Sequence, residues 1–177
     1  AHKVGIEIKP AGDFTELVIT GEVDETATFL PKLRLSTRIS TRVGSNRIVI
    51  SDRVSNMQGT DVEMQMLYHC NFGPPFLESG SVLKTPAAKI VPRDVTASAG
   101  IDSVETYLPP TPGYLEQVYW YVLRGDDRGD TIAMLRNAAG EKAVVLRFNI
   151  KQLPCFAQWK QTAAECDGYV TGLEPAV

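Results

Sequence analysis

The stretch from Leu67 to Pro75 contains the side chain best suited to proton transfer in this chain, the imidazole of His69. The only other histidine, His2, lies at the N-terminus, where chains are often poorly ordered. Imidazole titrates closer to neutral pH than any other side chain, so His69 could act as a general acid or a general base. A buried, hydrogen-bonded histidine or a loop cap is the alternative that its position leaves open.

A second candidate for proton transfer, Glu174, lies near the end of the sequence and is followed by Pro175. A carboxylate at the end of an apolar strand can point into a cleft, where partial burial would raise its pKa. Gly172, two residues earlier, removes a side chain from the same face of the strand and leaves room beside the carboxylate. The alternative is a solvent-exposed carboxylate at a strand end.

Two motifs contain the candidates: Tyr68-His69-Cys70-Asn71-Phe72-Gly73 surrounds His69, and a second one, over residues 153–160 and 168–175, includes Glu174. Both motifs resemble the galactose mutarotase (aldose 1-epimerase) superfamily and are closest to its DUF4432 family. The resemblance implies that His69 is the catalytic acid and Glu174 the catalytic base of a sugar mutarotase that needs no cofactor. It covers the middle and later parts of that fold, so strands before residue 1 and after residue 177 are expected to be missing.

Proteins that bind sugars stack aromatic rings on pyranose C–H faces and bind hydroxyl groups with amides and carboxylates. On this basis we expect a monosaccharide or sugar derivative to contact Asn71, Trp159, Asp167 and Tyr119. Core packing is the alternative for Trp159 and Tyr119, because aromatic residues at alternate strand positions usually fill a sandwich. A turn is the alternative for Asp167, which precedes a glycine.

Composition is that of an ordinary globular chain of 177 residues, with 44% hydrophobic and 22% charged residues. The net charge of −3 gives no overall attraction to nucleic acid or to an anionic membrane surface. No apolar run approaches the roughly 20 residues that a membrane span requires. Three dispersed cysteines argue against a disulfide framework and favour a cytoplasmic location, and with His2 at the terminus they form no metal-ligand cluster.

The hydrophobic pattern predicts mostly short strands. Alternation over residues 33–41 is the clearest, and the turn residues that follow it predict a β-hairpin with residues 47–54. A further alternating run, residues 62–68, predicts a strand that His69 closes. Other predicted strands are residues 14–23, a short strand around 88–92, a three-stranded antiparallel meander over 117–123, 131–136 and 142–150, and a final strand over 168–174.

Only residues 156–166 have a weak helical pattern, and no series of βαβ units is visible. We therefore expect an all-β fold, an antiparallel β-sandwich of the galactose mutarotase-like type, formed as one domain over residues 1–177. The expected function is that of an aldose 1-epimerase-like mutarotase. A non-catalytic carbohydrate-binding domain and an interaction module of the same fold are the alternatives.

Overall fold

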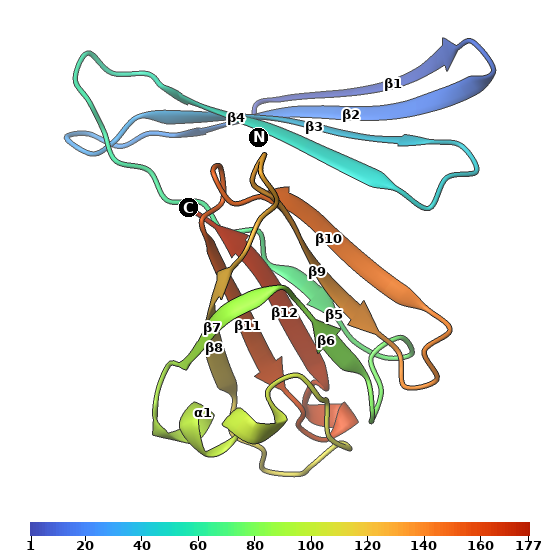
Figure 1. Cartoon of the computed structure of the whole chain (residues 1–177). Helices are drawn as coiled ribbons and strands as arrows, with labels where there is room; N and C mark the ends of the chain where they lie inside the picture. Colours follow the sequence, from blue (N-terminus) through green and yellow to red (C-terminus); the bar gives the residue numbers. More distant parts are fainter. The chain divides into compact units, whose positions relative to one another are not determined.

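The computed structural model describes residues 1–177 and divides them into two compact units, Ala1–Met64 and Gln65–Val177. Figure 1 shows the first unit in blue to teal and the second in green to red. Each unit has its own sheets, so each is described by itself. The single domain expected from the sequence stays a prediction.

The first unit is a four-stranded antiparallel sheet with the order β1-β2-β3-β4 (Figure 1). Its strands are β1 (Lys3–Ala11), β2 (Phe14–Glu25), β3 (Leu33–Arg42) and β4 (Ile48–Asn56). The predicted strand over residues 14–23 and the predicted hairpin are confirmed as β2 and as the β3–β4 pair. Strand β1 was not predicted.

The two faces of this sheet differ because side chains alternate along each strand. One face has a row formed by Ile6, Ile19, Ile39 and Ile50, which lie opposite one another across all four strands. The other face is polar and has the ion pairs Arg34–Asp24 at 2.7 Å and Arg38–Glu16 at 2.9 Å.

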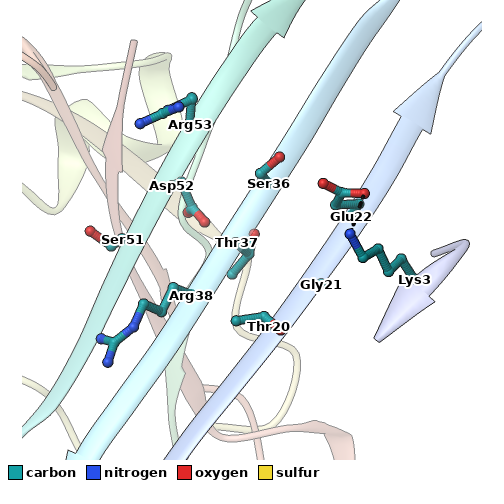
Figure 2. Close-up of a pocket in the computed structure, with 10 residues that line it drawn as sticks. All are labelled: Lys3, Thr20, Gly21, Glu22, Ser36, Thr37, Arg38, Ser51, Asp52 and Arg53. Carbon is teal, nitrogen blue, oxygen red and sulfur yellow. Dashed lines mark ion pairs between the residues drawn. The ribbon is translucent and has the colours of Figure 1, made fainter. Parts of the chain in front are cut away.

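A hollow of about 440 Å³ lies over the centre of this sheet, and Figure 2 shows the residues that line it. The lining consists of Lys3, Thr20, Gly21, Glu22, Ser36, Thr37, Arg38, Ser51, Asp52 and Arg53. It includes none of the site residues expected from the sequence.

The second unit is a β-sandwich of two antiparallel sheets. A five-stranded sheet has the order β5-β12-β11-β8-β7, and a three-stranded sheet has the order β10-β9-β6. The strands are β5 (Cys70–Phe72), β6 (Val82–Lys84), β7 (Ala87–Pro92), β8 (Gln117–Leu123), β9 (Asp130–Arg136), β10 (Ala143–Asn149), β11 (Cys155–Gln161) and β12 (Val170–Ala176). The short helices are α1 (Val95–Ala99), η1 (Ile101–Ser103) and η2 (Glu165–Asp167).

The hydrophobic core of this unit lies between its two sheets. Phe156 of β11 stacks on Phe148 of β10, with ring centroids 6.0 Å apart. Leu135 of β9 and Leu173 of β12 belong to the same buried cluster, and neither is exposed. The all-β antiparallel sandwich expected from the sequence is therefore confirmed. No helix in the structure combines the length and the apolar character needed to cross a membrane.

Three sequence predictions of local structure are wrong, and pairing between distant segments explains each of them. Residues 62–68 form no regular strand, and only an isolated bridge joins Leu67 to Ala176. Strand β8 pairs with β7 and β11 and not with β9, so the predicted meander is divided between two sheets. The weak helical pattern over residues 156–166 gives way to β11, because pairing with β8 and β12 overrides local propensity.

A buried lysine fixes the loop between β7 and β8 to the five-stranded sheet. Lys160 of β11 is 1% exposed, and its Nζ donates to the carbonyl oxygens of Ser103 and Thr106, each at 2.6 Å. Burial lowers the pKa of Lys160 to about 8. Burial of an ammonium group is costly unless its N–H donors are hydrogen-bonded, and these carbonyl groups supply the bonds that offset the cost for Lys160.

Replacement of Lys160 by methionine should destabilise the protein by about 1–3 kcal/mol, because the buried carbonyl groups lose their donor. Urea unfolding measures this loss. Lys142→Met is the control, because Lys142 is exposed and only its backbone is bonded to Asn137. Equal midpoints for the two variants would contradict the proposed role of Lys160.

Candidate active site

The pairing of β5 with β12 brings His69 and Glu174 together, although they are far apart in the sequence. Asn71 lies opposite Gly172 and Cys70 lies opposite Leu173, so the residue before β5, His69, comes opposite Glu174. The Nε2 atom of His69 is 3.1 Å from Oε1 of Glu174. The two candidates for proton transfer thus meet on one face of the five-stranded sheet.

The two side chains differ strongly in exposure. The side chain of Glu174 is 9% exposed and that of His69 is 48% exposed. Burial raises the pKa of Glu174, and the opposing attraction to His69 is the smaller effect. A carboxyl group with a raised pKa is a stronger base than an ordinary carboxylate, as a group that accepts a proton near neutral pH requires.

The contact between the two groups is close but poorly aligned. Oε1 of Glu174 is inaccessible to solvent and has no aligned hydrogen-bond donor, even though Nε2 of His69 lies only 3.1 Å away. We regard the pair as a close contact that is an ion pair only when His69 is protonated, and not as a directed hydrogen bond. A buried carboxylate oxygen that lacks a directed donor is unusual outside functional sites.

Asn71 determines which nitrogen of His69 is free for chemistry. The Nδ1 atom of His69 is 2.8 Å from Oδ1 of Asn71, and a carbonyl oxygen can only accept. Nδ1 therefore donates its proton to Asn71, and Nε2 is the nitrogen that faces Glu174. Asn71 is the one expected sugar contact that bonds directly to His69.

Gly172 leaves the space that the carboxylate of Glu174 occupies. A Cβ atom at position 172 would collide with Oε1 of Glu174 and would lie 3.2 Å from Cε1 of His69. Both atoms belong to the candidate pair, so any larger residue must displace one of them. The room expected beside the carboxylate from the sequence is real, and the carboxylate itself fills it.

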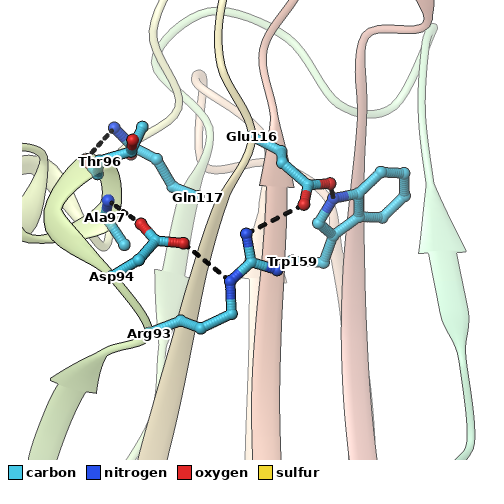
Figure 3. A network of polar contacts seen from close by, with 7 residues as sticks. All are labelled: Arg93, Asp94, Thr96, Ala97, Glu116, Gln117 and Trp159. Carbon is cyan, nitrogen blue, oxygen red and sulfur yellow. Dashed lines mark hydrogen bonds and ion pairs between the residues drawn. The ribbon is translucent and has the colours of Figure 1, made fainter.

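Trp159 lies on the same face of the sheet as the pair. It is opposite Gly172 in the β11–β12 register, and its ring meets the His69 ring edge-on with centroids 5.7 Å apart. Its Nε1 donates to Oε2 of Glu116 at 2.8 Å, as Figure 3 shows. Trp159 is only partly buried and does not belong to the hydrophobic core cluster, so the core-packing alternative does not describe it.

The structure does not bring Tyr119 or Asp167 to this site. Tyr119 is 0% exposed, belongs to the hydrophobic core and lies on the opposite face of the sheet from Trp159. The core-packing alternative therefore describes Tyr119, and burial raises its pKa to about 12. Asp167 ends the exposed turn η2, and its backbone N–H donates to the carbonyl oxygen of Ala164. The turn alternative describes Asp167.

Sequence reasoning missed two charged residues beside Trp159. Glu116 accepts hydrogen bonds from Trp159 and from Arg93, whose Nη2 is 3.0 Å from Oε1. Glu116 directly precedes β8, and Arg93 directly follows β7. Alternation along β8 indicates the face on which Glu116 lies. The pairing of β8 with both β7 and β11, which brings Arg93 and Trp159 to it, leaves no local pattern in the sequence.

The chain belongs to the DUF4432 family: residues 1–177 match the family described as "Domain of unknown function (DUF4432)". None of the curated proteins compared with the chain matches it. Among solved structures, the chain is similar to the crystal structure of a "putative aldose 1-epimerase" from Klebsiella pneumoniae subsp. pneumoniae MGH 78578. The two are 32% identical with a TM-score of 0.94, and the match covers 98% of this chain and 45% of that chain. This chain thus spans less than half the length of its structural neighbour.

Replacement of Glu174 by glutamine should make the protein more stable at pH 7. The folded-state pKa of Glu174 is raised above 4.5, so the folded protein binds more protons than the unfolded chain in this range. The contribution of the carboxyl group is therefore fully present below pH 4.5 and is lost as the pH rises through the folded pKa. Urea midpoints at pH 7 and pH 4 test this prediction. A stabilisation that is equal at both pH values, or absent at pH 7, would contradict it.

Replacement of Gly172 by alanine should separate Glu174 from His69, because the new Cβ occupies the position of the carboxylate oxygen. The His69 ring signals in a two-dimensional NMR spectrum should shift, and the melting temperature should fall. Gly59→Ala is the matched control, because a Cβ at position 59 meets no atom within 4 Å. His69 signals that stay unchanged in Gly172→Ala would disprove the close packing.

Proposed function

We propose that this chain provides the acid–base pair of an aldose 1-epimerase-like enzyme that interconverts the α and β anomers of a monosaccharide. The observation that carries the proposal is the 3.1 Å approach of His69 Nε2 to the buried carboxylate of Glu174. Membership of the DUF4432 family and similarity to a structure named as a putative aldose 1-epimerase support the same reaction class. The proposal includes a cytoplasmic location, with which three free cysteines agree.

The reaction requires one group to remove a proton and another to supply one. In this proposal Glu174 takes the proton of the O1 hydroxyl group while Nε2 of His69 protonates the ring oxygen O5. The C1–O5 bond opens to the aldehyde, the C1–C2 bond rotates, and the two proton transfers run in reverse as the ring closes. Each proton returns to the group that gave it, so no cofactor is consumed and no covalent intermediate forms.

The contact between the two groups is compatible with this chemistry if His69 moves to admit the sugar. O1 and O5 are both bonded to C1, so an acid and a base that lie close together can reach both oxygens. His69 is half exposed and can turn, whereas Glu174 is fixed in the sheet. Asn71 keeps the proton on Nδ1 of His69, so Nε2 faces the reacting oxygen.

One feature favours a different function, a carbohydrate-binding domain without turnover. His69 and Glu174 touch each other directly, with Nε2 and Oε1 only 3.1 Å apart and no sugar-sized gap between them. A protein in which the pair stays closed would bind a sugar over Trp159 and Asn71 without changing its anomeric form. Measurement of the anomer exchange rate distinguishes the two functions.

Replacement of His69 or Glu174 by glutamine should lower the enzymatic rate of mutarotation by about 10²–10⁴-fold, as expected when a general acid or base is lost. Polarimetry on freshly dissolved α-D-glucose and α-D-galactose measures the rate above the spontaneous reaction. The matched controls are His2→Gln and Glu165→Gln, which change the other histidine and an exposed glutamate before β12.

Wild type and both controls should accelerate exchange equally. Full activity in His69→Gln or Glu174→Gln would refute the assignment of the acid and the base. Binding of sugar by calorimetry without any acceleration would instead favour the carbohydrate-binding alternative.

A further inference from the structure

A chain of polar contacts leads from the start of helix α1 to the candidate active site (Figure 3). Asp94 caps α1 by accepting from the backbone N–H of Ala97 at 2.9 Å, and its other oxygen accepts from Nε of Arg93 at 2.9 Å. Nη2 of Arg93 donates to Oε1 of Glu116, and Oε2 of Glu116 accepts from the indole N–H of Trp159. The contacts therefore join a fixed helix end to the one aromatic ring that touches His69.

The hydrogen bond to Glu116 selects one orientation of the Trp159 ring. Indole has a single N–H donor, so rotation of the ring by half a turn would carry Nε1 away from the carboxylate. In the observed orientation the ring meets the His69 ring at an angle of 69°. The position of the indole beside the acid–base pair therefore depends on where the carboxylate of Glu116 lies.

Arg93 holds this carboxylate in place. Glu116 uses Oε2 for Trp159 and Oε1 for Arg93, so both of its oxygens are engaged. Hydrogen bonds from Trp159 and from Arg93 lower the pKa of Glu116, which keeps it an ionised acceptor. An exposed ion pair adds little to stability, so the arrangement is better explained by orientation of the indole than by folding.

We propose that Glu116, held by Arg93, is a positioning residue that fixes the indole of Trp159 beside His69 as the surface on which the sugar ring stacks. This inference rests on the proposed function, because it assigns the stacking surface of that same site. Glu116 acts through Trp159 and does not itself touch the reacting atoms. Its loss should therefore weaken sugar binding more than it slows proton transfer.

The test uses Trp120→Phe as the background, because Trp120 is the only other tryptophan and its removal leaves Trp159 as the single source of tryptophan emission. In this background Glu116→Ala should shift the emission of Trp159. It should also raise KM for D-galactose about fivefold with kcat almost unchanged, the order expected for a lost aromatic contact. Glu116→Gln keeps an acceptor for the indole and should restore most of the affinity.

Glu105→Ala is the matched control, because Glu105 forms a comparable ion pair with Lys84, in which Oε2 and Nζ are 2.7 Å apart. This ion pair does not involve Trp159. Glu105→Ala should leave both the emission and KM unchanged. The positioning role would be overturned if emission and KM in Glu116→Ala equal those of the background. A change in only one of them, or a fall in kcat alone, would overturn it as well.

The two proposals fail in different ways. If the background protein accelerates mutarotation and Glu116→Ala behaves identically, only the positioning role is wrong. If the wild-type protein does not accelerate mutarotation at all, the proposed function is wrong; the background alone does not decide this, because Trp120 lies on the same face of the sheet as Glu174. The positioning role is then tested by two measurements that compare Glu116→Ala with the background: the emission of Trp159 and the affinity for D-galactose in calorimetry. Both must change if the role is correct.

Discussion

The register between β5 and β12 is the constraint on which the candidate site depends. Cys70 pairs with Leu173 on the core side of the sheet, and this pairing carries His69 to Glu174 on the other side. If β12 shifted by one residue relative to β5, Glu174 would turn into the hydrophobic core, while His69 would stay on the opposite face of the sheet. The buried Leu173 therefore sets the register, and the contact between imidazole and carboxylate follows from hydrophobic packing on the opposite face.

The same site costs the fold stability. Glu174 is nearly buried, its Oε1 lacks an aligned donor, and Gly172 beside it contributes no side chain to the sheet. Folded proteins tolerate such features mainly where function requires them. By contrast, the buried ammonium of Lys160 is fully bonded to backbone carbonyl groups, as expected of a structural group. These two buried charged residues of the same sheet therefore differ in how completely their polar atoms are bonded.

Local pattern in the sequence was sufficient for several strands, and together with the family resemblance it pointed to the two residues of the pair, but not to their surroundings. Alternation of apolar and polar residues identified β3 and β4, and the motifs around His69 and Glu174 made both residues candidates. Alternation wrongly predicted a strand over residues 62–68. The alternating pattern is present there, but these residues have no regular partner strand. Glu116 and Arg93 could not be found, because their contact with Trp159 arises from strand pairing between distant segments.

A crystal structure of the protein with a bound monosaccharide tests the central claim most directly. The sugar should lie over Trp159 with O1 within hydrogen-bonding distance of the Glu174 carboxylate and with the ring oxygen facing Nε2 of His69. The imidazole should have turned away from Glu174 to make room, while its Nδ1 stays bonded to Asn71. A sugar bound elsewhere, or one held at this face with C1 remote from both groups, would contradict acid–base catalysis by this pair.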